Sequence, residues 1–97
     1  MPQIEISVEH PVGLHARPAA VFVRMASGFP AVITICKAVA GAKPANAKSI
    51  LAVLSLGVNK GDHIVLSAEG DRAEEALAAL SELVRLNFGE GHPSTGA

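Results

Sequence analysis

GLHARPAA, at residues 13–20, is the segment from which the organisation of the chain can be read, because it marks the start of a helix. Pro18 fits the first turn of a helix, where a missing backbone N–H costs nothing. The apolar residues that follow recur at helical spacing: Ala19, Phe22, Val23 and Ala26. The sequence therefore predicts a helix over residues 16–27 that ends before Gly28.

His15 and Arg17 lie at the start of this helix and form a candidate site for a phosphoryl group. The N–H groups of a first turn and the positive end of the helix dipole favour an anion, and arginine adds a cation with forked donors. Imidazole is a nucleophile near neutral pH because its unperturbed pKa is about 6.5. The pair predicts a phosphohistidine, although alone His15 could be a helix-capping surface histidine and Arg17 a solvated charge.

Length and composition limit the function to one small domain. The chain has 97 residues, 49% of them hydrophobic, and its three aromatic residues are all Phe. Eight Lys and Arg against nine Asp and Glu give a net charge of −1, so we expect neither a nucleic-acid nor a membrane-surface footprint. Small proteins or small anions remain as partners, and we expect a monomer.

Cys36, the one cysteine, lies in an apolar run and predicts a packed, unreactive thiol. The N-terminus lacks a basic segment followed by an apolar stretch, and no run reaches membrane-spanning length. These features predict a soluble, cytoplasmic protein.

The other elements follow from alternation and capping signals. Strands are predicted at residues 3–8, 31–37 and 63–68, with a short edge strand within 38–47. Ser49 predicts the cap of a short helix over about 50–55. Asp71 followed by Glu74 predicts a capping box for a last helix, whose apolar stripe is Ala73, Ala76, Leu77, Leu80, Leu83 and Val84.

The resulting order is β-α-β-β-α-β-α, with short connections that favour an antiparallel sheet covered on one face by helices, an α+β fold. We expect one domain over residues 1–88 and a flexible tail over 89–97, whose composition has no apolar periodicity.

Residues 13–19 (GLHARPA) and 46–58 (NAKSILAVLSLGV) together resemble the two signatures of HPr, the histidine-containing phosphocarrier family of the bacterial sugar phosphotransferase system. The resemblance covers roughly residues 3–88. It implies an open-faced β-sandwich, with a four-stranded antiparallel sheet covered on one face by three helices.

The resemblance also implies a relay chemistry without a cofactor. His15 would accept a phosphoryl group on Nδ1 from phospho-enzyme I and pass it to an enzyme IIA, while Arg17 positions the phosphate. Ser49 matches the serine that an HPr kinase/phosphorylase modifies in many bacteria. An exposed apolar patch on which partners dock is matched by Ala20, Ile50, Leu51 and Leu54.

The chain departs from the family pattern at residues 36–45, which are longer than usual and contain Pro44. The third strand is therefore expected to be short or bulged. His10, His63 and His92 are scattered without the spacing of metal ligands, so we expect no metal.

Two other functions are open at this point. One is a regulatory binding module, in which phospho-Ser49 recruits a transcription regulator or the chain serves the related nitrogen branch. The other is a small acyl-phosphate hydrolase, a class that would need a glycine-rich phosphate loop not found here.

Overall fold

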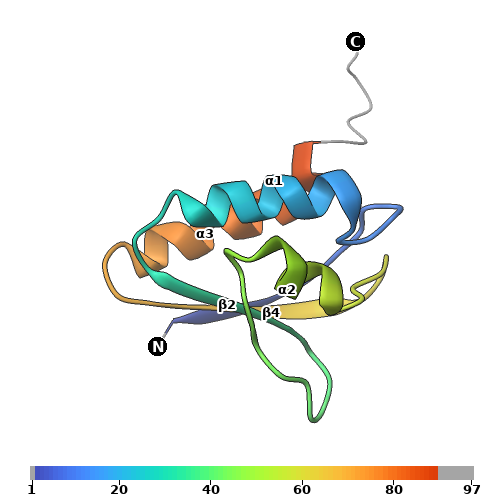
Figure 1. The fold of residues 1–97 in the computed structure, drawn as a ribbon, viewed down its shortest axis with the longest axis horizontal. Helices are drawn as coiled ribbons and strands as arrows, with labels where there is room; N and C mark the ends of the chain where they lie inside the picture. Colours follow the sequence, from blue (N-terminus) through green and yellow to red (C-terminus); the bar gives the residue numbers. More distant parts are fainter. Residues whose placement is uncertain (1, 90–97) are drawn as a thin grey trace.

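The structure, a computed structural model, describes residues 2–89. Its elements follow the order predicted from the sequence, with a short 3-10 turn added at the end (Figure 1). They are β1 (Gln3–Ser7), α1 (Ala16–Ser27), β2 (Val32–Lys37), β3 (Ala45–Asn46), α2 (Ile50–Ser55), β4 (His63–Glu69), α3 (Ala73–Arg85) and η1 (Asn87–Gly89).

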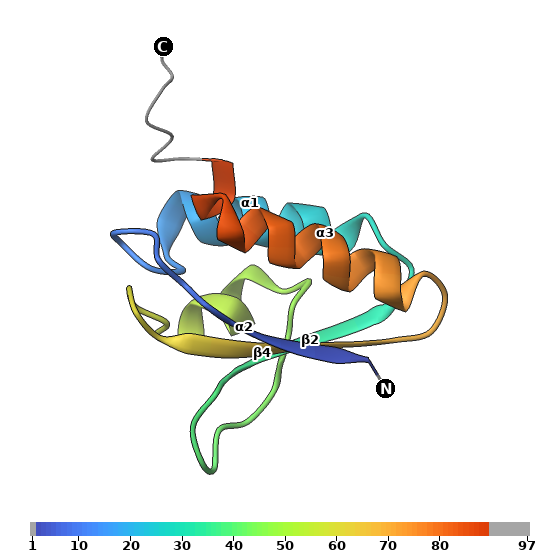
Figure 2. The ribbon, with the colours of Figure 1, turned by 180° about the vertical axis from the view of Figure 1, so that it is seen from behind.

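The four strands form one antiparallel sheet in the order β1-β4-β2-β3. α1 and α3 lie side by side over the same face of the sheet, and α2 packs against α1 and β3 (Figures 1 and 2). The loop between β2 and β3 projects toward the opposite side in both views. The predicted α+β class, with an open-faced sheet covered by helices, is confirmed.

Alternation along the central strands separates a buried side from an outer side. Ile33 and Ile35 of β2 pair with Ala68 and Leu66 of β4, and all four side chains are buried. Cys36 falls on the outer side by the same alternation and is half-buried. The thiol predicted to be packed is therefore only partly buried, on the outer side of the sheet.

The edges of the sheet are less regular than its centre. β1 is an edge strand, and burial along its alternating apolar residues is graded: Val8 just beyond its end is fully buried, whereas Ile4 is 37% exposed. β3, the other edge, has only two residues, as expected from the long segment before it. Pro44 immediately precedes it, where no ladder N–H is needed.

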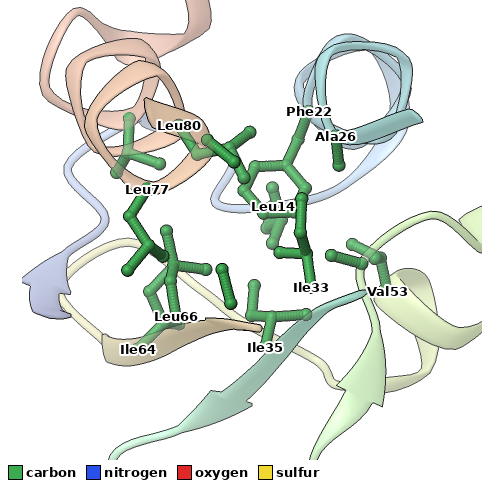
Figure 3. Packing of buried hydrophobic residues seen from close by; sticks show 14 of the residues in the cluster. Leu14, Phe22, Ala26, Ile33, Ile35, Val53, Ile64, Leu66, Leu77 and Leu80 are labelled. Atoms are coloured by element: carbon green, nitrogen blue, oxygen red, sulfur yellow. The ribbon is translucent and has the colours of Figure 1, made fainter. Parts of the chain in front are cut away.

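The core lies between the sheet and the helices, as Figure 3 shows. Phe22 of α1 and Leu80 of α3 point into the space above Ile33 and Leu66 of the sheet, and all four are fully buried or nearly so. Leu14, just before α1, is also fully buried there. Burying each such side chain stabilises the fold by about 1.5–3 kcal/mol, so the residue next to His15 is held by the core.

α3 begins differently from the sequence prediction. Its N-cap is Arg72 in the left-handed region (φ 61°), and no side chain caps it. The Ala73 N–H instead donates to the Gly70 carbonyl at 3.3 Å. The capping box of Asp71 with Glu74 was wrong, because a backbone turn made possible by Gly70 (φ +108°) starts the helix in its place.

Candidate functional site

His15 is the N-cap residue of α1, with extended backbone angles (φ −130°, ψ 164°). Its side chain makes no capping hydrogen bond and is half-buried. The simpler interpretation of His15 as a capping side chain is therefore wrong. The ring is turned instead toward the loop between α2 and β4, where Nε2 lies 3.2 Å from Asn59 Oδ1.

The first turn of α1 is an electropositive environment. It contains no acidic residue, and Arg17, its second residue, is exposed. Pro18 is buried at the third position. Ala16 has φ +48°, a backbone conformation that side chains with a Cβ rarely adopt. The N–H groups of such a turn have no acceptor inside the helix and favour an anion near His15.

Two loops meet directly behind His15, and Gly13 lets them approach. The Leu14 N–H donates to the Val58 carbonyl at 2.9 Å. Gly13 has φ +73°, and a Cβ placed on it would lie 2.4 Å from Val58 O and 2.7 Å from Asn59 Cα. No side chain fits there, so glycine at this position brings Asn59 within reach of His15.

The loop that carries Asn59 is closed by its own hydrogen bonds. The Asn59 N–H donates to Asp62 Oδ2 at 2.9 Å, and the Asp62 N–H donates back to the Asn59 carbonyl at 3.0 Å. Lys37 Nζ lies 3.5 Å from Asp62 Oδ2 and donates to the Gly57 carbonyl at 3.4 Å. The Asn59 N–H, with a smaller contribution from Lys37, holds the pKa of Asp62 below its usual range.

Ser49 lies at the opposite end of α2 from this loop and is the N-cap of that helix. Its Oγ accepts a hydrogen bond from the Ala52 N–H at 3.2 Å, which confirms the predicted cap. The residue before it is also anchored, because Lys48 Nζ donates to the Phe29 carbonyl at 2.7 Å. Ser49 is half-buried.

Exposed apolar side chains lie on α1 and α2, two helices that pack together. Ala20 is exposed, as are Ile50 (38%) and Leu51 (75%). Leu54 differs from the expectation, because it is half-buried and packs against the core. Val12, which the sequence analysis did not single out, is 53% exposed on the loop before His15.

Asn59 is the functional candidate that sequence reasoning missed. It is 44 residues from His15 in sequence, and a polar residue in a turn gives no signal of such a contact. Within residues 2–89, no three His, Cys, Asp or Glu side chains are grouped to hold a metal ion, and no helix is long and apolar enough to cross a membrane.

Comparison with known proteins gives consistent matches over nearly the whole chain. The family described as "PTS HPr component phosphorylation site" matches residues 2–85. The phosphocarrier protein HPr of Pseudomonas aeruginosa is 42% identical over 94 residues, which cover 94% of this chain and 99% of that protein. That of Streptomyces coelicolor is 45% identical over 84 residues, 87% of this chain and 88% of that protein.

A solved structure matches in fold as well as in sequence. The crystal structure of HPr-C-His from Thermoanaerobacter tengcongensis aligns with a TM-score of 0.85 and 47% identity, over 93% of this chain and 98% of that one.

Proposed function

Because the chain belongs to the HPr family of phosphotransferase-system phosphocarriers, we propose that His15 is the residue that carries the phosphoryl group. The group would arrive from phospho-enzyme I and leave to an enzyme IIA. The observation that carries this proposal is the place of His15, whose ring lies beside an electropositive helix start without capping it. Because the ring is only half-buried, enzyme I and an enzyme IIA can each reach a phosphoryl group bound to it.

The transfer is a substitution at phosphorus. The lone pair of His15 Nδ1 attacks the phosphorus of the donor phosphohistidine, and the donor N–P bond breaks with its electron pair returning to the donor ring. The first-turn N–H groups of α1 and the Arg17 guanidinium stabilise the charge on the three phosphate oxygens. The same steps in reverse, with an enzyme IIA histidine as nucleophile, discharge the carrier.

Partners would dock on the apolar surface formed by Ala20, Ile50 and Leu51. These side chains lie on α1 and α2, two helices that pack together. An exposed leucine contributes little to the fold, whereas its burial against a partner removes apolar area from water. Leu54, being half-buried, would add only its outer edge to this surface.

Ser49 would provide regulation of the same surface. Phosphorylation adds a charge of about −1.5 to −2 at the start of α2, where the helix N-terminus tolerates it. Ile50 and Leu51 follow directly, so the charge would weaken docking on them. Recruitment of a transcription regulator by phospho-Ser49 is a second role for this site, separable by binding assays with the modified protein.

The experiment is phosphorylation with enzyme I and radiolabelled phosphoenolpyruvate. The expected product carries one acid-labile phosphate, which is lost in His15→Ala and retained in His63→Ala. His63 is the matched control because it is an exposed histidine that pairs with Glu5 on another strand. A label that persists in His15→Ala would refute the proposal. Addition of unlabelled enzyme IIA should then remove the label from the wild-type protein.

A further inference from the structure

We propose that Asn59 is a positioning residue that keeps the ring proton of His15 on Nε2 and so presents Nδ1 as the nucleophile. The inference rests on the proposed function for its purpose, but its geometry belongs to the unphosphorylated protein. Its basis is the contact of 3.2 Å between His15 Nε2 and Asn59 Oδ1.

The chemistry of the two atoms determines which tautomer the contact favours. An amide oxygen only accepts hydrogen bonds, and a neutral imidazole has one N–H and one lone pair. The bond to Oδ1 therefore requires the proton on Nε2, which leaves the lone pair on Nδ1. In the Nδ1-phosphorylated ring Nε2 again carries a proton, so the same bond is kept before and after transfer.

Asn59 is held in place by bonds that do not involve its side chain. Its N–H and its carbonyl both bond to Asp62, and Lys37 links Asp62 to the Gly57 carbonyl. Gly13 packs against the backbone of the same loop. The side-chain amide of Asn59 thus projects from a turn that is held by hydrogen bonds of its backbone groups. The oxygen of this amide faces the ring of His15.

One backbone contact, and the burial of the two residues that make it, distinguish this arrangement from a chance surface pair. The Leu14 N–H bonds to Val58, so the residues directly before His15 and Asn59 are joined to each other at 2.9 Å. Leu14 and Val58 are both fully buried. The relative position of the His15 and Asn59 backbones is therefore set by the core, not by the side-chain bond itself.

The test is long-range ¹H–¹⁵N NMR of the His15 ring at a pH where the ring is neutral, because the two ring nitrogens report directly which one is protonated. The unchanged protein should show protonated Nε2. In Asn59→Ala the ratio of the Nδ1-protonated to the Nε2-protonated tautomer should rise roughly fivefold. This change corresponds to the loss of a hydrogen bond worth about 1 kcal/mol net at 25 °C. Lys60→Ala, an exposed neighbour in the same loop, is the matched control and should leave the ring unchanged.

A second variant separates the loss of the acceptor from a general disturbance of the loop. Asn59→Asp keeps an acceptor oxygen at the same distance from the backbone, so it should retain protonated Nε2 where Asn59→Ala does not. The initial rate of phosphorylation by enzyme I should fall by up to about fivefold in Asn59→Ala, with the final amount of label unchanged.

An unaltered tautomer ratio in Asn59→Ala, or the same change in Asn59→Asp, would overturn the assignment. The NMR result does not depend on enzyme I. Absence of labelling in the wild-type protein would count against the proposed function. The role of Asn59 would still be decided by the tautomer ratio of the His15 ring measured by NMR.

Discussion

The close approach of two loops at Gly13 gives the sharpest prediction of stability. In Gly13→Ala the new Cβ would lie 2.4 Å from Val58 O, a distance that real side chains do not adopt. The backbone there also has φ +73°, which costs an L-residue about 1–2 kcal/mol. Gly41→Ala is the matched control, because Gly41 has φ +81° but nothing within 4 Å of its added Cβ.

The difference between the two variants isolates the steric contribution. Overpacking of the new Cβ against backbone atoms costs about 1–3 kcal/mol. If the two loops move apart, the hydrogen bond from Leu14 to Val58 breaks, which costs about 1 kcal/mol net. Gly13→Ala should therefore be about 2–4 kcal/mol less stable than Gly41→Ala. For a domain of this size, that lowers Tm by at least about 8 °C.

The assay is urea unfolding followed by circular dichroism, with phosphorylation by enzyme I measured in parallel. Gly13→Ala should also slow phosphorylation, because the same movement carries Asn59 away from His15. If Gly13→Ala and Gly41→Ala destabilise the protein equally, a steric clash at Gly13 is excluded, since the strain of positive φ alone would then explain both.

Three further predictions concern the second helix, the loop and the docking surface. Ser49→Ala should lower the free energy of unfolding by about 1 kcal/mol through loss of the α2 cap, measured by urea unfolding; no change would contradict the cap. The pKa of Asp62 is lowered in the folded state by the Asn59 N–H, so its contribution to stability is present above the unfolded pKa of about 3.9 and is lost as the pH falls below it. Between pH 6 and pH 2 the free energy of unfolding should fall less steeply with pH in Asp62→Asn than in the wild-type protein. Identical slopes for the two proteins would exclude this contribution of Asp62. Leu51→Ala should change the free energy of unfolding by less than about 0.5 kcal/mol but raise the KM of enzyme I for this protein. Val53 is fully buried on the same helix, so Val53→Ala should lower the free energy of unfolding by about 2 kcal/mol. The reverse pattern would contradict the assignment of the exposed and buried faces of α2.

Local sequence patterns were sufficient for the elements that carry the site. Alternation predicted β2 and β4 to within one residue at each end, and the apolar spacing after Pro18 predicted α1 to the residue. Ser49 could be predicted as a cap because a cap needs only neighbours in sequence. These features depend on interactions within a few residues, which is why they can be read from one chain.

The errors arose where several local solutions compete. Asp71 and Glu74 fit a capping box, but the backbone turn at Gly70 with left-handed Arg72 starts α3. Cys36 is apolar like its neighbours in the run, which suggested packing, whereas the alternation along β2 places it on the side opposite Ile33 and Ile35. Asn59 depends on the meeting of two loops distant in sequence, and only the packing around Gly13 brings it to His15.

NMR of the protein after phosphorylation by enzyme I and phosphoenolpyruvate tests whether His15 carries the phosphoryl group on Nδ1. Coupling between phosphorus and the ring nitrogens identifies both the residue and the bonded atom. We expect phosphorus bonded to Nδ1 of His15, with the proton on Nε2 facing Asn59. Phosphorus bonded to Nε2, or to any other residue, would contradict this expectation.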